Sequence, residues 1–179
     1  MEIKGYNIPT KLSEMTVGQF EKVNKIMSDE SSLKIERYID YLESLDIPND
    51  VILTITDDEL FSIIKSIGEK EDINNELLKS FELDGYTYKS YDEEFSIRAI
   101  ELSMIEKKIS KENLNYFSYI IAILFKREDL TNREHYTDAH IKHKADLFKN
   151  LSAIDFYPYV IIVAEKLSKN LKSLYESSK

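Results

Sequence analysis

Apolar residues recur at helical spacing along most of the chain, beginning with two predicted helices. Three apolar side chains of the first helix lie three or four residues apart and share one face: Phe20, Val23 and Met27. Thr16 or Ser13 supplies the side-chain oxygen that caps this helix. The second helix covers residues 33–45 and ends before Pro48, because the residue preceding a proline avoids helical geometry. Its inward face is predicted to carry Ile35, Tyr38, Ile39 and Leu42.

A third helix has the clearest start signal in the sequence. Thr56 and Glu59 stand three residues apart, the spacing at which a hydroxyl and a carboxylate each accept a hydrogen bond from a backbone amide of the first turn. Four apolar residues then follow at helical spacing: Leu60, Ile63, Ile64 and Ile67. Gly68 is expected to end the helix, and a short further helix is predicted over residues 72–79.

The period changes from helix to strand between residues 81 and 91. Apolar and polar residues alternate on both sides of Asp84 and Gly85, a dipeptide typical of a two-residue type I′ hairpin turn. We therefore predict one small β-hairpin near residues 81–91. Residues 1–11 are expected to form an arm or an edge strand.

Helical spacing resumes after residue 96 and continues almost to the end of the chain. A helix is predicted around residues 97–105, and the strongly apolar stretch at residues 114–125 predicts the central core helix. Two more helices are expected at residues 137–151 and 157–175, with Pro158 in the first turn of the last one. The predicted fold is mainly α, a single compact bundle of about six to eight helices covering residues 1–179.

Three helix landmarks recur in the same order 80 or 81 residues apart. The paired landmarks begin at Thr16 and Ser96, at Tyr38 and Tyr119, and at Thr56 and Thr137. One interpretation is an internal repeat of two three-helix units, residues 12–80 and 92–155, linked by the hairpin at 81–91 and followed by a C-terminal helix at 156–176. The other is chance similarity between helices of similar composition, because few residues are identical.

Charge is unevenly distributed along the chain. The whole sequence of 179 residues carries −9, but residues 1–84 hold 19 acidic and 9 basic side chains and so carry −10. An acidic surface repels phosphate, so nucleic acid is not an expected partner. The absence of cysteine excludes disulfides and thiolate metal sites. We find neither a signal peptide nor the roughly 20-residue apolar run of a membrane-spanning helix, so a membrane location and secretion by a signal peptide are not expected.

Three histidines lie close together in the sequence: His135, His140 and His143. His140 and His143 are one helical turn apart, which is compatible with shared metal ligation in a metal-dependent hydrolase. The pattern differs from the His-Glu-x-x-His of metalloproteases, and the neighbouring Lys142 and Lys144 would repel a cation. We therefore expect surface histidines with no metal and no cofactor, and keep the hydrolase as a remote alternative.

The acidic clusters have a structural explanation as well. Asp57, Asp58 and Glu59 stand at a helix start, where carboxylates stabilise the helix dipole. The sequence contains no glycine-rich phosphate loop and no nucleophile motif, so we predict a protein that is not an enzyme. Its expected partner contacts are the hairpin tyrosines and this acidic cluster: Tyr86, Tyr88, Tyr91, Asp57, Asp58 and Glu59.

Four segments resemble small α-helical structural and assembly proteins of tailed bacteriophages, including the crAss-like phages. They are residues 12–20, 85–88, 115–125 and 156–158. The resemblance implies a virion-associated structural or assembly protein, acting as a tail or head accessory, cargo or chaperone-like factor. It implies contact with other phage structural proteins or with further copies of the chain, in the virion or the host cytoplasm. The alternative function is that of an acidic regulatory or host-takeover protein that binds a host enzyme.

Overall fold

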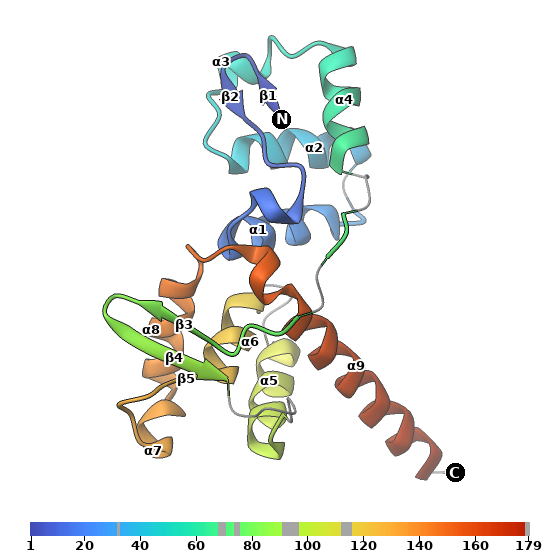
Figure 1. Cartoon of the computed structure of the whole chain (residues 1–179). Helices are drawn as coiled ribbons and strands as arrows, with labels where there is room; N and C mark the ends of the chain where they lie inside the picture. The colour runs from blue at the N-terminus through green and yellow to red at the C-terminus, as the bar shows by residue number, and fades with distance from the viewer. Residues whose placement is uncertain (32, 68–70, 74–75, 91–96, 112–115, 178–179) are drawn as a thin grey trace. The chain divides into compact units, whose positions relative to one another are not determined.

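The structure, a computed structural model, describes residues 1–31, 33–67, 71–73, 76–90, 97–111 and 116–177 (Figure 1). Within these residues, nine α-helices and two small antiparallel sheets confirm the mainly helical class. The chain divides into two compact units. Unit 1 comprises Met1–Ile73 and Asn150–Ile154, and unit 2 comprises Asn74–Lys149 and Asp155–Lys179.

Unit 1 contains a small hairpin followed by helices. Its elements are β1 (Glu2–Ile3), β2 (Tyr6–Asn7), the 3-10 helix η1 (Leu12–Glu14), α1 (Val17–Met27), α2 (Lys34–Ser44), α3 (Asn49–Ile52) and α4 (Asp57–Ile67). The expected N-terminal arm or edge strand is thus a two-stranded hairpin, in which Ile3 pairs with Tyr6. Its turn residues Lys4 and Gly5 have φ values of 55° and 83°.

Side-chain hydrogen bonds fix the starts of α1 and α4. Thr16, and not Ser13, caps α1: its hydroxyl accepts a hydrogen bond from the amide of Gln19 at 3.2 Å, and its own amide donates to the Gln19 side chain at 2.9 Å. The capping box predicted at α4 is confirmed, since the Thr56 amide donates to Glu59 at 2.8 Å and the Glu59 amide donates to the Thr56 hydroxyl at 3.3 Å. These bonds satisfy amides that have no partner inside the helix.

The core of unit 1 combines side chains of the N-terminal segment, α1, α2 and α4 with a piece of chain from residues 150–154. The largest apolar side chains with no exposed surface are Ile8, Val17, Tyr41, Leu42 and Ile63. The Tyr41 hydroxyl donates a hydrogen bond to the Pro9 carbonyl. Two backbone bonds fasten the distant segment, from the Val17 amide to Leu151 at 2.8 Å and from the Ala153 amide to Met15 at 2.9 Å.

The predicted inward face of α2 is wrong at two of its four positions. Tyr38 and Leu42 are buried, but Ile35 is 58% exposed and Ile39 is 37% exposed. The fully buried Tyr41, which the prediction omitted, lies on the inward face instead. When the apolar face of a helix is wider than the surface that covers it, part of that face remains exposed to solvent. The packing of the neighbouring elements decides which part is exposed.

Unit 2 combines a three-stranded sheet with helices. Its elements are β3 (Ser80–Leu83), β4 (Tyr86–Ser90), α5 (Ala99–Lys111), α6 (Phe117–Leu124), β5 (Phe125–Arg127), α7 (Asn132–His135), α8 (Asp138–Phe148) and α9 (Ala153–Ser177), whose first two residues are counted in unit 1. The predicted hairpin is confirmed, with its turn at Asp84 and Gly85, which have φ values of 52° and 77°.

Three predicted details of the C-terminal two-thirds need correction. Strand β5 was not predicted; it pairs with β4 directly after the apolar helix α6, so one apolar run contains both a helix and a strand. The helix predicted over residues 72–79 is absent at 72–73 and 76–79, the part that the structure describes. Pro158 lies in the second turn of α9 and not in the first, because the helix begins at Ala153. Gly68, the predicted end of α4, lies outside the described residues.

Aromatic rings form the core of unit 2. The ring of Phe81, on β3, has its centroid 5.2–5.3 Å from the rings of four residues: Tyr88, Phe125, Phe148 and Phe156. The Tyr159 hydroxyl donates a hydrogen bond to the Leu78 carbonyl at 2.6 Å, next to β3. Edge-to-face ring contacts with Phe148 and Phe156 therefore fix the hairpin to α8 and α9, and the stacked pair Phe81–Tyr88 joins its two strands.

Candidate functional site

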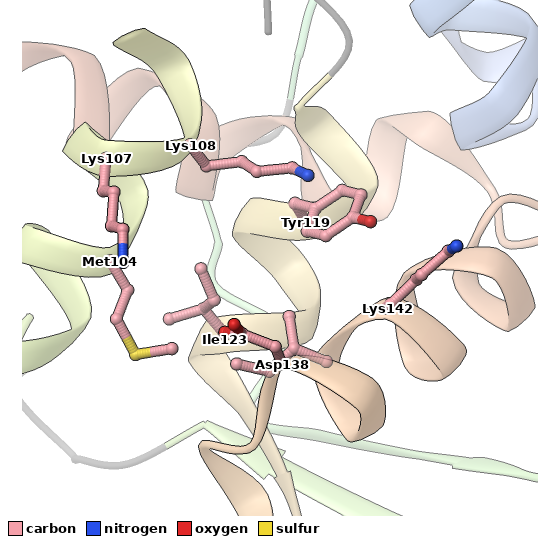
Figure 2. A pocket seen from close by; sticks show the side chains of 8 residues that line it. Met104, Lys107, Lys108, Tyr119, Ile123, Asp138 and Lys142 are labelled. Atoms are coloured by element: carbon pink, nitrogen blue, oxygen red, sulfur yellow. The ribbon is translucent and has the colours of Figure 1, made fainter. Parts of the chain in front are cut away.

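A pocket of about 380 Å³ lies in unit 2, lined by side chains of α5, α6 and α8 (Figure 2). Its apolar lining consists of Met104, Ile123 and Ile141. Ile123 and Ile141 are buried, with 2% and 3% of their surface exposed, whereas Met104 is half-buried. This lining is suited to an apolar group.

The rim of the pocket is basic. It carries the ammonium groups of Lys107, Lys108 and Lys142 and the single carboxylate of Asp138, a local net charge of +2. The Nζ atom of Lys108 lies 3.9 Å from the centroid of the Tyr119 ring, a cation–π contact that holds this side chain against the wall of the pocket. Lys107, Lys142 and Asp138 are exposed. An apolar floor below a positive rim fits a ligand that joins an apolar group to negative charge.

A buried lysine lies on the same helix, α8. Lys144 has no exposed surface, and its Nζ donates hydrogen bonds to the carbonyls of Ala122 at 2.5 Å and Phe125 at 2.8 Å. These carbonyls belong to the C-terminal end of α6, the negative end of the helix dipole. A third hydrogen bond runs to Nδ1 of His135 at 2.9 Å. The ammonium group thus caps α6.

His135 completes this buried cluster and is also fully buried. Because its Nδ1 accepts from Lys144, the proton of the neutral ring lies on Nε2 and is donated to the Ile123 carbonyl at 3.0 Å. Burial and the charge of Lys144 lower the pKa of His135 to about 3. Burial, assisted by the nearby charge of Arg127, lowers the pKa of Lys144 to about 7.

The histidines are therefore not equivalent. The expectation of surface histidines is wrong for His135, both of whose ring nitrogens are engaged inside the protein. His140 is half-buried and His143 is exposed. Within the described part of the chain, no group of three or more histidine, aspartate or glutamate side chains is placed to hold a metal ion.

The acidic residues expected to contact a partner lie at the start of α4, in unit 1. Asp57 and Asp58 are exposed there. Glu59 is engaged in the capping box, and its carboxylate also pairs with the Lys4 ammonium at 3.3 Å. Phe61, one helical turn after Asp57, is 67% exposed, although the sequence offered no reason to single it out.

The hairpin tyrosines have different environments in unit 2. Tyr86 is 43% exposed, and the guanidinium of Arg127 lies 4.0 Å from its ring centroid. Tyr88 is 2% exposed and packs in the aromatic core, so its side chain is not on the surface. Tyr91 lies outside the described residues. Residues two apart in a strand share a face, so position along β4 separates the two tyrosines: Tyr86 adjoins the turn, whereas Tyr88 packs against Phe81 and Phe148.

Helix α2 exposes an apolar surface that sequence reasoning placed in the core. It consists of Ile35 and Ile39, which are 58% and 37% exposed, and we refer to it as the α2 apolar face; Leu33, the residue directly before the helix, is 70% exposed. Ile35 and Ile39 are one helical turn apart and are therefore neighbours on the helix surface. Three acidic side chains on the same helix are also exposed: Glu36, Asp40 and Glu43.

No protein-family model, curated protein or solved structure matches this chain. Among the helices that the structure describes, none is long and apolar enough to cross a membrane. Three surfaces of the described residues therefore bear on function: the basic pocket, the exposed start of α4 and the α2 apolar face.

Proposed function

We propose that this protein is a non-enzymatic structural or assembly protein that acts through protein–protein contacts. The resemblance of its sequence to small helical proteins of tailed phages suggests a virion or an assembling particle as the setting. The observation that carries the proposal is the α2 apolar face.

Large aliphatic side chains are costly to leave in water, and two of them share the α2 apolar face while the exposed Leu33 directly precedes the same helix. Burying an isoleucine or leucine side chain contributes about 1.5–3 kcal/mol, so a partner that covers Leu33, Ile35 and Ile39 gains several kcal/mol. Clustered apolar anchors of this kind provide most of the binding energy of protein interfaces. Single exposed apolar residues are common on protein surfaces, but a clustered set marks a contact site.

The charges beside the α2 apolar face define the chemistry of the partner. Glu36, Asp40 and Glu43 are exposed on this helix, and unit 1 as a whole holds 16 acidic and 8 basic residues, a net charge of −8. Complementary charge accelerates association and selects among partners. The partner surface is therefore an apolar groove with a basic rim.

Copurification tests this function. The tagged chain is captured together with the proteins encoded beside its own gene, and the proteins of purified particles are identified by mass spectrometry. The double variant Ile35→Glu, Ile39→Glu is expected to bind its partner at least about tenfold more weakly, since roughly 1.4 kcal/mol is lost for each factor of ten. Both positions are exposed, so the variant should keep its melting temperature.

Leu53→Glu is the matched control, the same kind of change at an aliphatic side chain that is 80% exposed outside α2, and this variant should bind almost as the wild type does. A chain that binds none of its neighbours and is absent from particles would contradict the proposal. Capture of a host enzyme, together with absence from particles, would instead favour the acidic regulatory protein as the function.

A further inference from the structure

The pocket of unit 2 and the exposed start of α4 in unit 1 have complementary chemistry. We infer that the pocket of one copy of the protein binds α4 of a second copy, so that copies associate head to tail. This inference rests on the proposed function, because it names a second copy of the chain as one of the partners.

The α4 surface combines an apolar anchor with negative charge. Phe61 is 67% exposed, and Asp57 and Asp58 precede it by four and three residues, so all three side chains lie on neighbouring positions of one helix surface. Both aspartates are exposed. We refer to these three residues as the α4 anchor.

The pocket offers the matching groups. The ring of Phe61 fits the apolar floor formed by Met104, Ile123 and Ile141. The two carboxylates of the α4 anchor then meet the lysines of the rim, which outnumber its single carboxylate three to one. Charge pairs at the edge of a contact guide its orientation, while the buried ring provides most of the affinity.

The exposure of the rim favours a protein segment over an enclosed small molecule. Small-molecule sites bury about 70–90% of their ligand, whereas the rim side chains Lys107, Lys142 and Asp138 are themselves exposed. One face of a helix is already covered by the protein to which the helix belongs. An open pocket is therefore sufficient to cover its exposed face.

The distribution of charge favours a head-to-tail arrangement of identical chains. Unit 1 carries −8, whereas unit 2 holds 17 acidic and 16 basic residues and carries −1. Two copies of unit 1 therefore repel each other, and the contact with unit 2 avoids that repulsion. In such a heterologous contact, an assembly of several copies has an unoccupied pocket at one end and an unoccupied α4 anchor at the other. Further copies can therefore add until a ring closes or a filament forms.

Sedimentation velocity of the full chain over a concentration series, at low and high salt, is the experiment. One helix surface in one pocket is a small interface, so we expect weak association whose average mass rises with concentration and falls with salt. Phe61→Lys removes the anchor and opposes the rim lysines; Lys107→Glu with Lys142→Glu reverses the rim. Each variant alone should sediment as a monomer.

Mixing the two variants separates a specific contact from general damage. The Phe61→Lys chain retains an intact pocket and the Lys107→Glu, Lys142→Glu chain retains an intact α4 anchor. Their mixture should therefore form a 1:1 dimer and nothing larger. All the changed side chains are exposed, so each variant should keep the melting temperature of the wild type. Asp50→Lys on α3 and Lys169→Glu on α9, both exposed, are charge-reversal controls that should associate as the wild type does.

A wild-type chain that remains monomeric up to about 1 mM would overturn the inference. Association that survives both variants, or variants that fail to form the mixed dimer, would overturn it as well. The proposed function is tested independently through the α2 apolar face and other partners, so either idea can fail while the other stands.

Discussion

Lys144 shows how one charged residue can determine a local structure. Its ammonium group is fully buried and serves three acceptors, two of them carbonyls at the end of α6 and the third Nδ1 of His135. An isolated buried charge is very unfavourable, so the cluster is stable only because each donor has an acceptor. A shorter or apolar side chain at this position would leave several buried acceptors without hydrogen bonds.

We therefore predict that Lys144→Met lowers the free energy of unfolding by about 3 kcal/mol or more, because each buried polar group left without a partner costs roughly 1–3 kcal/mol. Urea denaturation followed by circular dichroism measures this difference. Lys142→Met, an exposed position on the same helix, should change stability by no more than about 0.5 kcal/mol. Equal effects of the two substitutions would show that the buried cluster contributes little.

At the scale of elements, the β3–β4 hairpin depends on its two-residue turn. Asp84 and Gly85 both have positive φ, at 52° and 77°, as a type I′ turn requires. A Cβ atom added at Gly85 would meet nothing within 4 Å, so a substitution there changes only the backbone energy. The aromatic contacts of Phe81 in the adjoining strand β3 depend on the register that this turn sets.

Gly85→Ala is expected to destabilise the protein by about 1–2 kcal/mol, the cost of the left-handed conformation for a residue with a Cβ atom. Gly85→Asn should cost less, because asparagine tolerates that conformation. Thermal unfolding of the two variants provides the comparison. The same loss in both would mean that backbone conformation is not the cause.

At the scale of the whole molecule, the buried cluster makes stability depend on pH. The pKa of His135 falls to about 3 from 6.5, so between these values the unfolded chain binds a proton that the folded protein excludes. The pKa of Lys144 falls to about 7 from 10.5, so the unfolded chain retains a proton there that the folded protein releases. In both windows the unfolded state binds more protons, and stability therefore rises with pH. Burial raises the pKa of Tyr41, which reverses the trend above about pH 10.

We predict that the wild-type free energy of unfolding depends more positively on pH than that of Lys144→Met between pH 7.5 and 9.5. The difference in slope should approach about 1.4 kcal/mol per pH unit, the value for one proton. Urea unfolding at several pH values in that window measures it, and the variant corrects for the remaining titrating groups. Parallel slopes would contradict a lowered pKa of Lys144 in the folded protein.

Local signals in the sequence were sufficient for the helical class and for several element boundaries. The capping box at Thr56 and Glu59 and the turn at Asp84 and Gly85 involve residues at most three positions apart, and the structure confirms both. Short-range hydrogen bonds and backbone preferences act between such neighbours whatever surrounds them. The internal repeat stays a prediction, although Thr56 and Thr137, 81 residues apart, both cap helices.

Only the tertiary structure decided which side of each element faces the core. Periodicity placed Ile35 and Ile39 inside, yet the neighbours of α2 cover the side that carries Tyr41 and leave the two isoleucines exposed. The periodicity also predicted that a helix ends at Phe125, where the structure has the start of strand β5, because a buried segment is apolar whether it is a helix or a strand. The pocket depends on three separate helices, α5, α6 and α8. The hydrogen-bond acceptors of Lys144 lie 9 to 22 residues away from it in the sequence. These features arise from packing between distant segments, which no local pattern in the sequence records.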